Sequence, residues 1–341
     1  MPRIDPAALT RDLVEIPSPT GEETAVVAFM HELLVRLGYQ VKRLEVAPGR
    51  DVLYATLEPP TIVFSTHLDV VPPHLPFAED DEWLYGRGTC DAKGIAAAMV
   101  AAADRLRSEG EQRIGLLFVV GEETGGDGAQ AASALEPKGK YLINGEPTEN
   151  RLSIGQKGAL CLTLHAAGKA AHSAYPEEGR SAIEALLDAL ERIRGLALPT
   201  EPLLGSTTLN IGQIAGGVAP NVIPPEADAT LLFRTVANAD QLERAMRDAA
   251  GPGVEVRRGY GFPHVRSRPL PGWETTTVKF ASDLGHLGAW GEGYQLGPGT
   301  IRVAHTAEER IRRTELRDGV ECYVRLATQL LGKGEGGKGK R

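Results

Sequence analysis

IGLLFVVGEETGG, residues 114–126, joins an apolar run to two adjacent glutamates. An apolar run of this kind, closed by a glycine, is typical of a strand that is buried on both faces, as in a parallel sheet. Glu122 and Glu123 stand where that strand is expected to end. Because neighbouring carboxylates repel each other, this position requires open water, a proton held by one of them or a bound cation.

The segments around this stretch alternate between helix and strand patterns. Thr20, with Glu23 three residues later, has the spacing of a capping box, and Gly38 is placed to end the helix that follows. The Ala-rich segment 91–110 predicts a second helix. Short apolar or alternating runs predict strands over residues 39–46, 52–57, 61–65, 113–120 and 140–143. This alternation predicts an α/β sheet.

From about Leu160 the order of elements becomes strand, helix, strand, strand, helix, strand. That order predicts a ferredoxin-like α+β unit of about 100 residues, inserted in the α/β domain. A helix is expected from Glu274 to Leu287 after the insertion. The expected domain boundaries are 1–162 and 268–331 for the two parts of the α/β domain, 163–267 for the insertion and 332–341 for a disordered tail.

Composition narrows the class of partner. The net charge is −8 and basic residues form no stripe, which argues against nucleic acid or an anionic membrane and favours a small-molecule substrate. The three cysteines, Cys90, Cys161 and Cys322, are far apart and form no CxxC pair, so a reducing, cytoplasmic location is expected. No stretch approaches the roughly 20 apolar residues of a membrane span.

Polar side chains follow three of the predicted strands. His67 and Asp69 come after the first strand, Glu122 and Glu123 after the second, and Glu146 after the third. The carboxyl ends of strands in an open α/β sheet border the crevice in which ligands bind. These side chains are therefore expected to converge.

Two further residues are placed to join this cluster. Asp91 stands at the start of the Ala-rich helix, and His305 directly precedes a predicted helix that Thr306 caps, with Glu309 three residues later. Two imidazoles and several carboxylates suit zinc or a similar divalent ion, and they are too many for one tetrahedral ion that keeps a water. Two ions that share a bridging carboxylate fit better. One of the adjacent glutamates can then bind an ion while the other acts as general base on a water activated by zinc.

Each of these residues alone has an ordinary structural explanation. Aspartate is a favoured N-cap residue, so Asp91 could begin the helix. His67 and His305 could be hydrogen-bonded structural histidines, and adjacent glutamates after a strand often form a solvated turn. Cys90 is best explained as a small buried thiol. The glycines that flank most of these positions allow sharp bends of the backbone, and the combination favours the metal site.

Seven motifs occur in order along nearly the whole chain: STHLDVVP, LYGRGTCDAKG, GEETGG, GEPTEN, GKAAHSAYPEEGRSAI, GGVAPNVIPPEADATLLFRT and GPGTIRVAHTAEE. Together they resemble the M20 family of metallopeptidases, the group of acetylornithine deacetylases, succinyl-diaminopimelate desuccinylases and aminoacylases. GRGTCDAKG and GEPTEN are most similar to acetylornithine deacetylases. Residues 156–158 stand where desuccinylases tend to carry an arginine pair, which weakens that alternative.

The resemblance implies a catalytic domain with two zinc ions, for which cobalt or manganese are possible substitutes. It implies five metal ligands, with Asp91 as the bridge: His67, Asp91, Glu123, Glu146 and His305. Glu122 would be the general base. Asp69 would orient His67, since a ligating imidazole usually donates its second N–H to a carboxylate.

The resemblance also makes the inserted domain a lid and dimerisation module of a homodimer. His172 would reach the active site of the partner subunit and stabilise an oxyanion, and Arg234 would bind the substrate carboxylate. Asn221 and Gly299 match substrate-contacting positions. Without the resemblance, these residues are explained as a surface histidine, a surface strand arginine and two turn residues.

The expected function is removal of an acyl group from an N-acyl amino acid, with N2-acetylornithine as the first candidate substrate. A desuccinylase, or a dipeptidase or carboxypeptidase of the same family, is the near alternative. A binding or scaffolding protein that kept the fold and lost catalysis belongs to a different class. The presence of suitable residues at every metal and base position disfavours it.

Overall fold

The computed structural model describes residues 3–332. The chain divides into two compact units. The main unit comprises Met1–Ile154, Ser267–Thr276 and Ser282–Arg341, and the inserted unit comprises Gly155–Arg266 and Thr277–Ala281. Of the predicted tail, only the first residue lies within the described part of the chain.

The main unit is built on a mixed sheet in which strands run in the order β1-β2-β6-β3-β7-β17-β8. These strands are β1 (Gln40–Ala47), β2 (Arg50–Thr56), β3 (Ile62–His67), β6 (Ile114–Val119), β7 (Tyr141–Asn144), β8 (Leu152–Gln156) and β17 (Glu292–Gln295). The central strands β6, β3, β7 and β17 are parallel, so their carboxyl ends lie at one edge of the sheet. Every residue of β3 and β6 is buried. The α/β sheet and the buried strand before the two glutamates are confirmed.

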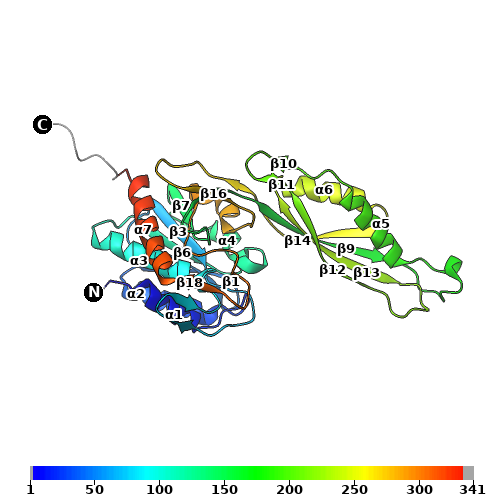
Figure 1. The fold of residues 1–341 in the computed structure, drawn as a ribbon, viewed down its shortest axis with the longest axis horizontal. Helices are drawn as coiled ribbons and strands as arrows, with labels where there is room; N and C mark the ends of the chain where they lie inside the picture. The colour runs from blue at the N-terminus through cyan, green and yellow to red at the C-terminus, as the bar shows by residue number, and fades with distance from the viewer. Residues whose placement is uncertain (1–2, 333–341) are drawn as a thin grey trace. The chain divides into compact units, whose positions relative to one another are not determined.

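Helices cover this sheet. They are α1 (Pro6–Val14), α2 (Thr24–Arg36), α3 (Lys93–Ser108), α4 (Asp127–Ala132) and α7 (Arg313–Leu330). The Ala-rich helix α3 lies on β3 and β6 and packs against both α1 and α7 (Figure 1). It is buried on nearly all sides, as expected of a helix without a polar face. No helix within residues 3–332 is both long and apolar enough to cross a membrane.

The first predicted capping box is wrong. The N-cap residue of α2 is Glu23, and its side chain makes no capping bond. Glu23 instead forms an ion pair with Arg50 at 3.0 Å. The hydroxyl of Thr20 donates to the carboxylate of Asp69 at 2.8 Å. Both side chains of the local motif are therefore engaged by residues from other parts of the main unit.

Two other expected helical segments are also wrong. Within residues 274–287, Thr275–Val278 forms strand β16, which pairs with β8, and Asp283–Gly285 forms a short 3₁₀ turn. Three threonines followed by a valine favour extended backbone, because β-branched side chains pack well on a pleated sheet. The segment after His305 is irregular as far as strand β18 (Arg310–Arg312), which pairs with β5 (Trp83–Tyr85), and α7 begins only after β18.

The inserted unit is a four-stranded antiparallel sheet with two helices on one face. Its elements are β9 (Gly158–Ala167), α5 (Ala182–Arg194), β12 (Thr208–Gly216), β13 (Glu226–Thr235), α6 (Ala239–Ala250) and β14 (Val254–Phe262). The strand order β12-β13-β9-β14 is that of a ferredoxin-like unit, which confirms the prediction. Buried and less buried residues alternate along β9 and β13, because one face of the sheet packs under α5 and α6.

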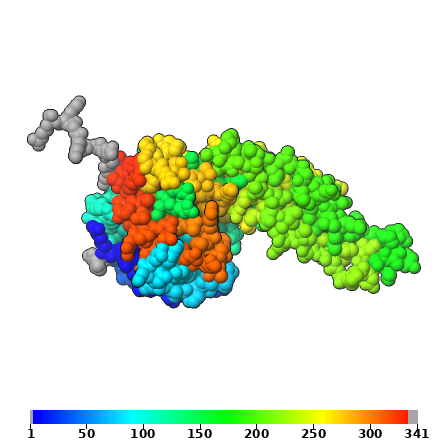
Figure 2. Space-filling view, in the orientation of Figure 1, coloured from blue at the N-terminus to red at the C-terminus, as the bar shows by residue number. Residues whose placement is uncertain are grey.

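Several large apolar side chains of the inserted unit are exposed. They are Tyr175, Leu187, Leu203, Ile214 and Val218, out of seven such residues in the described part of the chain. Ile214 lies on β12, an edge strand of the sheet. Figure 2 shows the surface of this unit in green to yellow. An edge strand with exposed apolar residues is a surface that can pair with another chain.

Gly94, in the first turn of α3, packs against the backbone that precedes the helix. A methyl group at this position would lie 2.1 Å from the carbonyl oxygen of Thr89. Gly94→Ala should therefore displace residues 89–92 and lower the free energy of unfolding by about 1–3 kcal/mol. Urea unfolding followed by circular dichroism measures the change.

Gly288→Ala is the matched control. Gly288 is exposed, and a methyl group there meets no atom within 4 Å and requires no left-handed backbone. We expect it to change the free energy of unfolding by less than about 0.5 kcal/mol. Equal effects of the two substitutions would contradict the packing role of Gly94.

Candidate metal centre

The predicted site residues of the main unit follow the carboxyl ends of its parallel strands. His67 is the last residue of β3, Glu122 and Glu123 follow β6, and Glu146 follows β7. Gly121 has a φ of +76°, a left-handed conformation that turns the chain directly before the two glutamates. Three segments distant in sequence are thus delivered to one edge of the sheet.

Asp91 lies at the centre of the cluster. Its Oδ1 is 3.1 Å from Nε2 of His67, and its Oδ2 is 3.4 Å from Nε2 of His305. Asp91 does not cap α3, whose N-cap residue is Ala92, so the capping explanation is wrong. Burial raises the pKa of Asp91, but hydrogen bonds from His305 and His67 outweigh it and hold the pKa below its ordinary value. A carboxylate that faces two imidazoles with separate oxygens has the arrangement of a bridging ligand.

Glu123 lies on the side of His305. Its Oε1 is 3.0 Å from Nε2 of His305. One ligand atom each of His67, Asp91 and Glu123 lies within 4.8 Å of the other two. Burial raises the pKa of Glu123, and the hydrogen bond from His305 opposes this effect. The structure therefore brings four of the five predicted ligands into direct contact.

The fifth predicted ligand, Glu146, is buried with an unused oxygen. The residue is 4% exposed, and its Oε1 has no hydrogen-bond partner within residues 3–332. Burial, and then the charge of Asp91, raise the pKa of Glu146 well above its ordinary value. A buried carboxylate without a donor is costly unless it holds a proton or a cation. Together with two imidazole nitrogens and two further carboxylates, this oxygen suits a divalent ion such as zinc.

Asp69 fixes both His67 and the glutamate turn. Nδ1 of His67 lies 2.9 Å from the backbone carbonyl of Asp69 and 3.6 Å from its carboxylate, so the orienting contact comes mainly from the backbone. With Nδ1 as the donor, Nε2 is free to bind a metal. The carboxylate of Asp69 accepts the backbone N–H groups of Glu122 and Glu123, both at 3.2 Å. It also accepts the hydroxyl of Thr20.

Glu122 is the first residue of the 3₁₀ turn Glu122–Thr124. Burial, and then the charge of Glu146, raise its pKa well above the ordinary value. A carboxylate in this state takes up a proton more readily than a solvated one, as a general base must.

His172, Asn221 and Arg234 belong to the inserted unit. His172 and Asn221 lie on neighbouring segments, because the backbone N–H of Ser173 donates to the carbonyl of Asn221 at 3.0 Å. The side chain of His172 is exposed. Arg234 lies on β13 next to Phe233, which is buried under α5 and α6, so the arginine occupies the opposite face of the sheet.

Gly299 lies in the main unit, in the loop that follows β17. Its φ is +89°, and a methyl group there would lie 2.5 Å from Sγ of Cys90. Its N–H donates to the carboxylate of Glu315 at 2.9 Å. Backbone packing therefore accounts for this glycine, and a contact with substrate stays a prediction. Cys90 is fully buried as expected, and burial raises the pKa of its thiol.

Two carboxylates near the site were missed by the sequence reasoning. Glu309, expected to cap a helix, is 2% exposed and accepts the backbone N–H of Asp91 at 3.1 Å. Asp283, expected in a helix, is 1% exposed, and neither carboxylate oxygen has a hydrogen-bond partner among the described residues. Burial raises the pKa of Asp283 to about 8, and the charges of His67 and Asp69 act on it in opposite directions. Neither location has a sequence signal, because both depend on contacts between distant segments.

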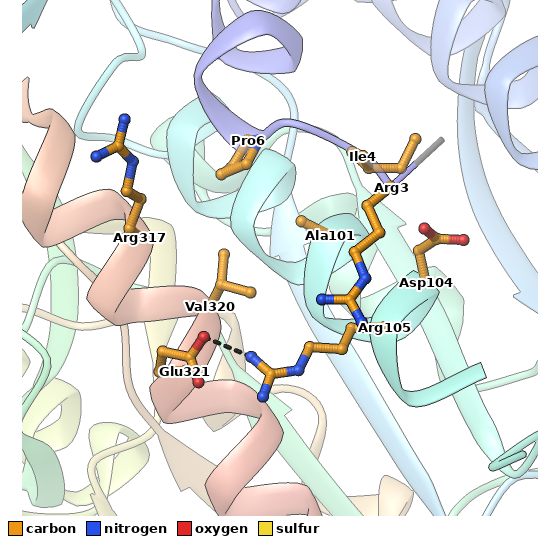
Figure 3. A pocket seen from close by; sticks show the side chains of 9 residues that line it. All are labelled: Arg3, Ile4, Pro6, Ala101, Asp104, Arg105, Arg317, Val320 and Glu321. Carbon is orange, nitrogen blue, oxygen red and sulfur yellow. Dashed lines mark hydrogen bonds and ion pairs between the residues drawn. The ribbon is translucent and has the colours of Figure 1, made fainter. Parts of the chain in front are cut away.

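A pocket between the N-terminal segment, α3 and α7 is separate from these ligands (Figure 3). It is lined by Arg3, Ile4, Pro6, Ala101, Asp104, Arg105, Arg317, Val320 and Glu321. An ion pair between Arg105 and Glu321 joins the two helices there. Because a helix rises about 1.5 Å per residue, Asp104 is on the order of 20 Å from Asp91 along α3. This pocket is therefore not part of the metal centre.

Comparison with known proteins identifies relatives over nearly the whole chain. The model of peptidase family M20/M25/M40 matches residues 63–329. A peptidase M20 domain-containing protein of Schizosaccharomyces pombe is 36% identical over 95% of this chain and 84% of its own length. A probable carboxypeptidase of Aspergillus niger is 38% identical over 93% of this chain and 87% of its own length. The crystal structure of an M20 family metallo-carboxypeptidase from Sulfolobus solfataricus has a TM-score of 0.76 at 17% identity, covering 96% of this chain and 99% of that chain.

The matched range contains every predicted metal ligand and the predicted base, from His67 to His305. The relatives named here are peptidases and carboxypeptidases, so the special closeness to acetylornithine deacetylases is not supported. The Sulfolobus solfataricus structure shares the fold of this chain over nearly its whole length, and the family model and the sequence relatives show that the chain belongs to peptidase family M20/M25/M40.

Proposed function

We propose that this protein is a metal-dependent hydrolase that cleaves an amide bond next to a free carboxylate. The observation that carries the proposal is the carboxylate of Asp91, which faces His67 with one oxygen and His305 with the other. Glu146 adds a buried oxygen with no hydrogen-bond partner in the described chain. Membership of a peptidase family supports hydrolysis of peptide or related amide bonds.

Two overlapping groups of residues would hold two ions. His67, Asp91 and Glu146 would bind one ion. Asp91, Glu123 and His305 would bind the other, with Asp91 as the bridge. Zinc fits these ligands, and cobalt or manganese are possible substitutes. Bound ions would polarise the scissile carbonyl and favour the ionisation of water at neutral pH.

Glu122 would move the proton in this reaction. As general base it would take a proton from the attacking water, and as general acid it would give the proton to the leaving nitrogen. Its backbone N–H is held by the carboxylate of Asp69, which supports a fixed position for the base. The pKa raised by burial and by Glu146 favours uptake of the proton.

The inserted unit would recognise the substrate. The guanidinium of Arg234 can bind a carboxylate through two parallel hydrogen bonds, and His172 would stabilise the oxyanion. Asn221 and Gly299 would provide further contacts with the substrate.

A free α-carboxylate beside the scissile amide occurs both at the C-terminus of a peptide and in an N-acyl amino acid. The names of the relatives support a short peptide, from which the C-terminal residue would be released. The motifs GRGTCDAKG and GEPTEN favour N2-acetylornithine as a second candidate. The two candidate substrates belong to one chemical class. In both, the reaction removes an acyl group from the amino group of an amino acid.

We further propose a homodimer formed through the inserted unit. Ile214 on the edge strand β12 is 58% exposed and Val218, just beyond it, is 75% exposed. Pairing of two such edges would cover both side chains. In this dimer His172 would serve the site of the partner subunit. Three free cysteines support a cytoplasmic location.

A substrate panel tests the proposed function. Protein loaded with zinc, cobalt or manganese should hydrolyse short peptides or N-acyl amino acids that have a free α-carboxylate. Amidation of that carboxylate should lower kcat/KM about 100-fold, because Arg234 would lose a charged partner. Arg234→Ala should remove this discrimination. Equal rates on acid and amide would refute carboxylate recognition, and absence of both activity and bound metal would favour a binding protein.

Glu122→Gln should keep the fold and the bound metal and lower kcat by at least about 100-fold, because the amide cannot take the proton. Metal analysis and circular dichroism establish that only the proton acceptor has changed. Glu45→Gln, at an exposed position on β1, is the control and should keep full activity. A Glu122→Gln variant with the normal rate would exclude this residue as the base.

Mixing of two inactive variants tests the shared site. Glu122→Gln chains keep His172, and His172→Ala chains keep Glu122, so a mixed dimer would contain one complete site if the histidine acts across the interface. Activity should then reappear when the two variants are exchanged into mixed dimers. Co-expressed variants that form mixed dimers and stay inactive would show that His172 does not act in the partner's site.

A further inference from the structure

A buried carboxylate lies directly behind the segment that presents Asp91. Glu309 is 2% exposed. Its Oε1 accepts three backbone N–H groups, from Gly88 at 2.9 Å, Cys90 at 3.3 Å and Asp91 at 3.1 Å. One oxygen atom of Glu309 therefore accepts hydrogen bonds from most of the turn that leads into α3. The backbone of Asp91 is fixed by this contact and not by the helix.

The second oxygen of Glu309 binds Arg87, which is also 2% exposed. The guanidinium of Arg87 donates in addition to the carbonyl of Thr306 at 3.2 Å and to the carbonyl of Pro73 at 3.3 Å. Thr306 directly follows His305 in the chain. The ion pair thus connects the segment of one predicted ligand to the segment of another.

Each residue of the Arg87–Glu309 pair contacts the backbone segment to which the other residue belongs. Glu309 is in the same segment as His305 but binds the turn of Asp91, whereas Arg87 is in the turn of Asp91 but binds the backbone next to His305. Pairing of β18 with β5 continues the contact beyond the ion pair.

We propose that the Arg87–Glu309 pair is a positioning device that sets the spacing between Asp91 and His305, and through it the affinity and geometry of the ion that these two residues share. The inference rests on the proposed metal site and deepens it. Neither residue touches the ion or the substrate in this scheme.

A packing role alone does not account for the charge of Glu309. Glu309 is buried beside Asp91, and burial of a second carboxylate at this place is costly. Only a carboxylate can accept from three N–H groups and a guanidinium at once, because an amide would direct its own N–H₂ toward Arg87. The negative charge of Glu309 is therefore explained because one side chain has to hold two separate segments together through its hydrogen bonds.

Titration of the metal-free protein with Co²⁺ tests the proposal. Glu309→Gln should weaken the binding of one of two ions by about 10- to 100-fold, the range found for residues that support metal ligands. It should also change the visible absorption spectrum of the bound cobalt, which reports the ligand geometry. The kcat of the loaded enzyme should fall, while KM changes less.

Glu111→Gln is the matched control. Glu111 is 4% exposed, pairs with Arg113 at 2.9 Å and accepts the backbone N–H of Arg113. It precedes β6, at the end of the strand away from the metal centre. This variant loses a similar buried charge, so it should lose stability but keep the cobalt affinity and the spectrum.

If Glu309→Gln does not fold, Arg87→Lys provides the same test, since it keeps the buried cation but its shorter side chain lacks Nη1, the nitrogen that donates to both Glu309 and Thr306. Normal cobalt affinity and an unchanged spectrum in a folded variant would overturn the proposal. Wild-type protein that binds no cobalt would instead overturn the proposed metal site. The two failures are therefore distinguishable.

Discussion

The carboxylate of Asp91 faces His67 with one oxygen and His305 with the other. This contact joins residues that lie more than 200 positions apart in the sequence. This contact requires that the end of strand β3, the turn before α3 and the loop before β18 lie next to one another. The parallel order of the central strands places the end of β3 at the carboxyl edge of the sheet. The contacts of Glu309 hold the turn and the loop together.

The same arrangement concentrates negative charge. The fold holds Glu122, Glu123 and Glu146 where they are poorly solvated, and this burial raises the pKa of each carboxyl. Backbone contacts keep Glu122 and Glu123 there, since the carboxylate of Asp69 fixes their turn through two N–H groups. A site built in this way would need no rearrangement to bind a cation, and the cation would offset the repulsion among its ligands.

The sequence predicted those parts of the site that depend on strand ends. His67, Glu122 and Glu146 each follow an apolar run, so their location at one sheet edge follows from periodicity and from the parallel topology. The two errors at capping-box sequences share another cause. Thr20 and Glu309 both belong to sequences with capping-box spacing, yet each side chain binds a partner from a distant segment instead. A local pattern cannot show that a stronger tertiary partner competes for the same side chain.

The residues that bear on the reaction lie in the main unit, and most of those that bear on the choice of substrate lie in the inserted unit. GRGTCDAKG contains Arg87 and Asp91, and GEPTEN contains Glu146 and Asn150, whose side chain donates to the carbonyl of Glu315 at 2.9 Å. Both motifs therefore shape the backbone around the predicted metal ligands. Discrimination between a peptide and N2-acetylornithine would instead depend on the inserted unit, which contains Arg234 and His172 but none of the predicted metal ligands.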